Sequence, residues 1–149
     1  MAMPTVAQTR GPHTISTDPK RLDVDAVHAY LSRSYWAKGI PRDVVATSLA
    51  ASLCFGVYEG VAQIGFARVI TDGATFAYLC DVYVLEEHQG KKLARWLMEM
   101  IMAHPELQGI RRFVLVTTSA PGMYHKFGFT PVPEKNGYMQ VVRRHAYET

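Results

Sequence analysis

The strongest constraint in this 149-residue sequence is a change of hydrophobic period near Gly90. Before it come three β-rich runs, at residues 53–59, 62–71 and 75–85. The first two runs meet at Glu59-Gly60, a pair typical of a hairpin turn. After Gly90, apolar residues recur at the three-and-four spacing of one helix face, until Pro105 ends the pattern. The chain should therefore form an antiparallel meander that leads through one tight turn into a long helix.

Further elements are predicted on both sides of this central unit. A helix with Asp23 as its N-cap should run to Leu31, and a second helix should begin at Pro41, whose fixed φ suits a first helical position. Downstream, the predicted elements are a strand at residues 112–118, a short helix at 121–127 and a closing pair of strands at 129–131 and 139–144. No repeat or second domain is visible.

Length and composition indicate one domain, because 149 residues that are 48% hydrophobic can close a single core. The longest apolar runs are much shorter than the roughly 20 residues of a membrane span, so no membrane association is expected. Residues 1–12 lack an apolar segment of signal-peptide length and predict a flexible tail, with the domain at 13–149. We therefore expect a cytoplasmic protein, in which Cys54 and Cys80 remain reduced thiols.

The charge pattern narrows the class of ligand. The formal net charge is only +3, and the basic residues are scattered apart from a few short pairs such as Lys91 and Lys92. Nucleic-acid binding usually shows a denser basic stripe, so a localised anionic ligand fits better. The six histidines show no paired spacing of metal ligands, and no metal site is predicted.

Residues 81–94 run from a strand through a tight turn into the long helix. Such a turn directs unpaired backbone amides and the positive end of the helix dipole at one point, which suits a pyrophosphate. Lys91 and Lys92 would add positive charge there. The alternative interpretation is an ordinary strand-to-helix connection that carries a solvated lysine pair.

Residues 119–129 form a second informative stretch. They follow the predicted strand at 112–118 and place Tyr124 on a short helix, one turn before Gly128. A phenol in this position can donate a proton to a leaving thiolate. A tyrosine near a helix end can also serve only in packing.

Taken together, these stretches resemble the GNAT superfamily of N-acetyltransferases, and the resemblance covers the chain from about His13. The family's phosphate-binding signature (Gln or Arg, two variable residues, Gly, one variable residue, Gly or Ala) falls on residues 89–94. The family's Tyr, any, Lys, any, Gly, Phe element is intact at 124–129. The resemblance implies an α+β fold: a mixed, mostly antiparallel sheet flanked by helices. Its implied order is one strand, two helices, three strands, a helix, a strand, a helix and two strands.

The resemblance also implies acetyl-CoA as cosubstrate and direct attack of an amine on its thioester within a ternary complex. The implied coenzyme A-binding residues are Val82, Tyr83, Val84, Gln89, Gly90, Lys91, Lys92, Leu93, Ala94 and Tyr124. Val82 and Val84 would pair their backbone with the pantetheine arm, and a β-bulge within 81–84 would open the slot. Lys92 replaces the glycine of the signature, and a helical φ would accommodate it.

The acceptor amine must be neutral to attack, so the site needs a base or a desolvating pocket. Cys80 stands where several relatives place a Glu or His. Its neighbour Asp81 lies in an otherwise apolar strand and is predicted to contact or deprotonate the acceptor; the alternatives are a structural hydrogen bond and a proton carried by water. The loop between the first two helices should bind the acceptor through Tyr35, Trp36 and Arg42, although the two aromatics could instead belong to the core.

Three functions therefore remain open. The leading one is an N-acetyltransferase acting on a small-molecule or peptide amine. The second is a non-catalytic acyl-CoA-binding or sensor protein, which Lys92 and the missing usual base make conceivable. The third, a nucleotide-binding protein, is weaker, because no phosphate-binding loop of the GxxxxGK[ST] type occurs. The predicted strand at 139–144 also offers an edge for pairing into a homodimer.

Overall fold

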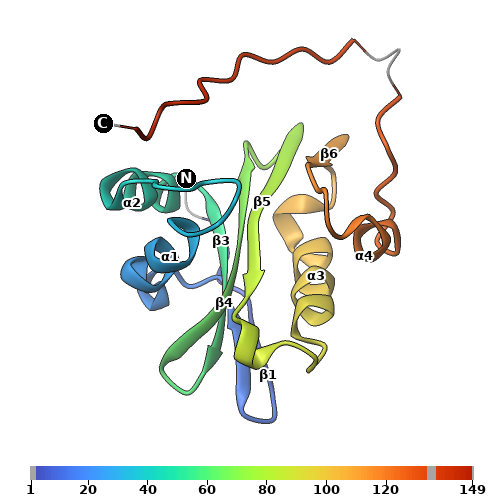
Figure 1. The fold of residues 1–149 in the computed structure, drawn as a ribbon. Helices are drawn as coiled ribbons and strands as arrows, with labels where there is room; N and C mark the ends of the chain where they lie inside the picture. The colour runs from blue at the N-terminus through green and yellow to red at the C-terminus, as the bar shows by residue number, and fades with distance from the viewer. Residues whose placement is uncertain (1–2, 134–136, 149) are drawn as a thin grey trace.

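The computed structural model describes residues 3–133 and 137–148 and shows a six-stranded sheet between two layers of helices (Figure 1). The strands lie in chain order and are β1 (Ala7–Arg10), β2 (His13–Ser16), β3 (Leu53–Glu59), β4 (Ala62–Thr71), β5 (Phe76–Val84) and β6 (Arg112–Leu115). Neighbouring strands are antiparallel except β5 and β6, which are parallel. The predicted α+β fold with a mixed sheet is confirmed, and β3 and β4 have the predicted bounds.

The helices are α1 (Val24–Leu31), α2 (Arg42–Ala50), α3 (Leu93–Ala103) and α4 (Pro121–His125), with short 3₁₀ turns η1 (Pro19–Arg21), η2 (Glu86–His88) and η3 (Pro105–Leu107). Figure 1 shows α1 and α2 on one side of the sheet and α3 on the other. Alternate residues of the strands serve the two sides, since Phe55 packs in the core with α3 whereas Cys54 packs in the core with α1 and α2. The central strands are therefore buried on both faces. Within the described residues, no helix is long and apolar enough to cross a membrane.

The helix boundaries follow local chemistry. The Asp23 carboxylate accepts a hydrogen bond from the Ala26 amide at 3.0 Å, as expected of the predicted N-cap. The helix α2 begins at Arg42, one residue after the predicted start, and Pro41 is its N-cap. The long helix α3 buries the predicted apolar face and ends two residues before Pro105.

The predicted flexible tail is wrong for residues 7–10. These residues form β1, which pairs with β2 in a hairpin whose two-residue turn contains Gly11 at φ 57°. The strand is exposed along its whole length, because it lies at the edge of the sheet and needs no apolar residues. Its polar sequence therefore carries no hydrophobic alternation from which a strand could be predicted.

The predicted closing strands at 129–131 and 139–144 are also absent from the described part of the chain. The strand at 112–118 is shorter than predicted, ending at Leu115, and the last helix ends at His125. Residues 137–148 lie over the top of the molecule as drawn in Figure 1 and lead toward the side of α2. We call residues 137–148 the C-terminal arm.

Candidate functional site

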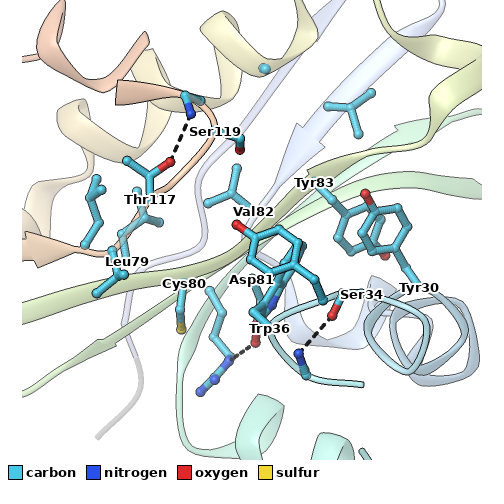
Figure 2. A pocket seen from close by; sticks show the side chains of 18 of the residues that line it. Tyr30, Ser34, Trp36, Leu79, Cys80, Asp81, Val82, Tyr83, Thr117 and Ser119 are labelled. Atoms are coloured by element: carbon cyan, nitrogen blue, oxygen red, sulfur yellow. Dashed lines mark hydrogen bonds and ion pairs between the residues drawn. The ribbon is translucent and has the colours of Figure 1, made fainter. Parts of the chain in front are cut away.

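A cleft of about 1310 Å³ opens beside the C-terminal part of β5. Most of its lining comes from four places: the loop between α1 and α2, residues 78–84 of β5, the turn before α3, and the segment from the end of β6 to α4. Arg68 of β4 and two residues of the C-terminal arm, Gln140 and Tyr147, also line it. Figure 2 shows Trp36 and Asp81 on one side of the cleft and Thr117 and Ser119 on the other. The stretches singled out in the sequence, 81–94 and 119–129, thus meet at one place.

The cleft exists because β5 separates from β6. The parallel pairing of the two strands ends at Leu79 and Leu115. Directly afterwards β5 carries a bulge, since Arg68 pairs with Cys80 and Phe66 with Tyr83, so that the single residue between them on β4 faces two on β5. Asp81, at the bulge, has φ 55°, in the left-handed region. The bulge predicted within residues 81–84 is therefore confirmed.

The Asp81 carboxylate is held by two neighbours. One oxygen accepts a hydrogen bond from Trp36 Nε1 at 2.9 Å, and the other forms an ion pair with Arg68 Nε at 2.9 Å. Arg68 also donates to Ser52 Oγ at 3.2 Å. Although burial opposes its charge, the adjacent Cys80 and Asp81 hold the pKa of Arg68 above its usual value. Asp81 thus connects β5 to β4 and to the loop between α1 and α2, which is the structural role named as an alternative for this residue.

The turn before α3 is shaped by two residues with positive φ, Gly90 at 83° and Lys92 at 61°. The expectation that Lys92 has a helical φ is therefore wrong: it is the N-cap of α3 in the left-handed conformation, where glycine would be free of strain. No side chain caps this helix, so its first amides keep no side-chain partner. Gln89 donates from Nε2 to the Val84 carbonyl at 3.0 Å, which fastens the turn to β5.

Most of the predicted binding residues line the cleft, and two do not. Those that line it are Tyr35, Trp36, Asp81, Val82, Tyr83, Val84, Gln89, Gly90, Lys92, Leu93, Ala94 and Tyr124. Lys91 is exposed and is not part of the lining. Arg42 lies outside the cleft and forms an ion pair with Asp25 at 2.6 Å, because it occupies the first turn of α2, beside α1.

The aromatic residues of the lining divide into two groups. Tyr35 and Trp36 are exposed, at 70% and 42%, so neither is a core residue. Tyr35 Oη lies 3.1 Å from Thr118 Oγ1 and spans the cleft from one wall to the other. Tyr83, in contrast, is buried and stacks on Tyr30 with ring centroids 3.8 Å apart (Figure 2).

Tyr124 and Cys80 are the titratable groups of the lining whose pKa values bear on proton transfer. Burial, and to a smaller extent the nearby Tyr35, raises the pKa of the half-buried Tyr124 phenol. Burial also raises the pKa of Cys80 to about 12, so its thiol is neutral at pH 7. The structure therefore presents a protonated phenol and a neutral thiol to the cleft.

Sequence reasoning missed several residues at the cleft, including Arg33, Ser34, Arg68, Thr117 and Ser119. Arg68 lies on β4 and could be found only from its pairing with Cys80 across the sheet. The structure also brings ligand-type atoms of His13, Glu59 and His88 within 4.8 Å of one another. The first two of these residues are partners in the β2–β3 register, a proximity that sequence spacing does not reveal.

Comparison with known proteins agrees with this geometry. Residues 50–131, just over half of the chain, match the family model described as Acetyltransferase (GNAT) domain. A Gibberella zeae protein that bears an acetyltransferase name is 39% identical, over 79% of this chain and 78% of that protein. A GNAT-family structure from Xanthomonas campestris pv. campestris is 44% identical, covers 99% of this chain and 100% of that chain, and superposes with a TM-score of 0.88.

A Clostridium acetobutylicum protein that was solved with acetyl-CoA shares the fold. It is 15% identical, covers 87% of this chain and 94% of that chain, and has a TM-score of 0.63. Fold likeness alone is shown at that identity, whereas the family model and the two closer relatives match in sequence. The chain therefore belongs to the GNAT acetyltransferase family.

Proposed function

We propose that this protein transfers the acetyl group of acetyl-CoA to a primary amine, and that both substrates meet in the cleft between β5 and β6. The observation that carries the proposal is the convergence of three features on this cleft. They are the uncapped start of α3, the part of β5 that β6 leaves unpaired, and the Tyr124 phenol. Each of them fits a different part of an acyl-CoA thioester.

The start of α3 suits the pyrophosphate of the coenzyme. Amides without a side-chain cap and the positive end of the helix dipole favour an anion at this point. The exposed Lys92 ammonium would add charge beside them. Beyond Leu79, the β5 backbone no longer pairs with β6, so the Val82 and Val84 peptides would be the partners of the pantetheine amides.

The reaction would be a direct attack of a neutral amine on the thioester carbonyl. A C–N bond forms, the C–S bond breaks, and the thiolate that leaves takes a proton from the Tyr124 phenol. The raised pKa of Tyr124 keeps the phenol protonated at neutral pH, as an acid requires. Tyr124 would regain its proton from solvent after the product leaves.

The proton lost by the amine would go to water. Both carboxylate oxygens of Asp81 are already engaged, by Trp36 and by Arg68, and the Cys80 thiol is neutral. Asp81 would then act by holding Trp36 in place. The exposed rings of Tyr35 and Trp36 would border the acceptor, because a ring face attracts a cationic amine and its neighbouring groups.

The test is a screen of small-molecule and peptide amines with acetyl-CoA, followed by thiol release. With an amine that reacts, Tyr124→Phe should lower kcat by about a hundredfold and leave the Kd for acetyl-CoA within twofold, because only the proton donor is lost. Tyr35→Phe is the matched control, since it removes a phenol from the same cleft without removing the acid. An unchanged kcat in Tyr124→Phe would refute the acid role.

Two observations favour a second candidate function, a non-catalytic acyl-CoA sensor. Lys92 holds the strained N-cap position of the turn, and Asp81, the carboxylate next to Cys80, has both oxygens engaged by Trp36 and Arg68. Calorimetric titration with acetyl-CoA and with ATP, together with the amine screen, separates the two candidate functions. Binding of acetyl-CoA without turnover of any amine would support the sensor, and a preference for ATP would refute both.

A further inference from the structure

In the described part of the chain, the acceptor side of the cleft, bordered by the loop between α1 and α2, offers no free negative charge to an ammonium ion. The carboxylates of the lining among residues 3–133 and 137–148 are Asp81 and Glu86. Asp81 is bound by Trp36 and Arg68. Glu86 accepts hydrogen bonds from both terminal nitrogens of the Arg33 guanidinium, at 3.1 and 3.4 Å. An alkyl ammonium group would therefore enter the cleft without a counter-ion.

The titratable side chains on the acceptor side are also unsuited to removing a proton from an ammonium ion. Burial raises the pKa of Cys80 to about 12, so the thiol is neutral at pH 7. Burial also raises the pKa of the Tyr30 and Tyr78 phenols, which line the same side. A ring face can hold an ammonium ion, but these groups would leave it protonated, and a protonated amine does not attack a thioester.

The described lining contains one imidazole, that of His88, and it lies on the coenzyme side. A ring nitrogen of His88 is within 4.8 Å of a carboxylate oxygen of Glu59. Glu59 pairs with Ala62 at the start of β4, whereas Cys80 pairs with Arg68, six residues further along that strand. Six residues of a strand span about 20 Å. His88 is therefore too far from Cys80 to act on an amine bound there.

Aromatic rings form much of the acceptor side. The aromatic residues that line it are Tyr30, Tyr35, Trp36 and Tyr78. Trp36 donates its Nε1–H to Asp81, and Tyr35 Oη lies 3.1 Å from Thr118 Oγ1, so the polar groups of both residues are engaged by the protein. What Tyr35 and Trp36 present to the cleft is ring surface. Their planes are 82° apart with centroids at 5.2 Å, an arrangement in which a third ring can stack on one and meet the edge of the other.

We propose that the acceptor is an aromatic amine, whose amino group is attached directly to a ring. The inference rests on the acetyl transfer proposed above. The lone pair of such a nitrogen is delocalised into its ring, so the amine is neutral at pH 7 and needs neither a counter-ion nor a base before it attacks. Its nitrogen forms the C–N bond as the C–S bond breaks, the thiolate takes the Tyr124 proton, and the nitrogen then loses a proton to water. The acceptor ring packs against Tyr35 and Trp36.

The first test compares aniline with benzylamine, which differ by one methylene group between the ring and the nitrogen. Benzylamine is an ammonium ion at pH 7, so its kcat/KM should rise about tenfold per pH unit, whereas kcat/KM for aniline should stay level between about pH 6.5 and 8.5. At pH 7, kcat/KM for aniline should be higher by about tenfold. A higher kcat/KM for benzylamine at pH 7 would overturn the inference and leave acetyl transfer to amines in place. Binding of acetyl-CoA without acetylation of any amine would instead refute the proposed function, and the inference with it.

The second test removes a ring from the acceptor side. Tyr35 is 70% exposed, so its replacement does not disturb the core. Tyr35→Leu should raise KM for aniline about fivefold, because the ring contact is lost. Tyr35→Phe is the matched control, since it keeps the ring, and its KM should stay within twofold of wild type. Both variants should keep the Kd for acetyl-CoA. An equal KM in the two variants would overturn the proposed contact between rings.

Discussion

Replacing Lys92 tests how the turn before α3 is built. Lys92 has φ 61° and ψ 22° at the N-cap of α3, which is the left-handed region. For a residue with a Cβ, this conformation costs about 1–2 kcal/mol of folding free energy. Glycine adopts it without strain, but its greater conformational freedom in the unfolded chain costs about 0.5–1 kcal/mol on folding. Lys92→Gly should therefore stabilise the fold by about 0.5–1 kcal/mol. Lys92→Ala should not stabilise it, because alanine keeps the Cβ.

The assay is thermal unfolding of the three proteins, with the binding of acetyl-CoA measured in parallel. For a domain of this size, about 1 kcal/mol corresponds to a rise in Tm of roughly 2–4 °C. The expected order of Tm is Lys92→Gly above wild type, with Lys92→Ala close to wild type. Because both variants lack the ammonium, both should bind acetyl-CoA severalfold more weakly if that charge contacts the pyrophosphate.

The two readouts separate the two roles of this residue. Stability reports on the backbone, and it should differ between the glycine and alanine variants. Affinity reports mainly on the charge, and it should fall in both. If Lys92→Gly melts no higher than Lys92→Ala, the left-handed conformation carries no strain and the reasoning from φ is refuted.

Other predictions concern the cleft. Asp81→Asn should keep the left-handed backbone, because asparagine tolerates this conformation. It should lower the free energy of unfolding, measured in urea, by about 3 kcal/mol, because Arg68 loses its buried charged partner. A loss below about 1 kcal/mol would contradict this reasoning. Cys80→Ala should leave kcat within twofold, since a thiol with a pKa of about 12 is no base at pH 7, and a large loss would reinstate it. The part of kcat that depends on Tyr124 should persist to above about pH 10, because burial raises the pKa of the phenol and only the protonated phenol can act as the acid. A pH–rate profile in which kcat falls to half below about pH 9 would assign the acid to another group. Apart from these substitutions, chelation with EDTA should leave Tm unchanged, and a fall in Tm would mean that His13, Glu59 and His88 together hold a metal ion.

What could be predicted from the sequence was local. The bounds of β3 and β4 follow from two β-rich runs and a glycine turn, and α3 follows from its apolar period and Pro105. The strand-to-helix turn and the position of Tyr124 were visible for the same reason, since each lies within one short stretch of chain. These features depend on side-chain spacing and turn chemistry, which a linear sequence displays directly.

Only the tertiary structure decided how distant segments meet. The polar strand β1 is held by its pairing with β2. The Asp81 carboxylate is bound by Arg68 and Trp36, which lie in two other parts of the chain. Arg42 lies outside the cleft, where it forms an ion pair with Asp25. The arm at 137–148 has the composition of a strand, but a strand requires a neighbour, and the neighbour is chosen by the packing of the whole chain. Local periodicity therefore determined the elements, and pairing over long sequence distances determined the cleft and the course of the C-terminus.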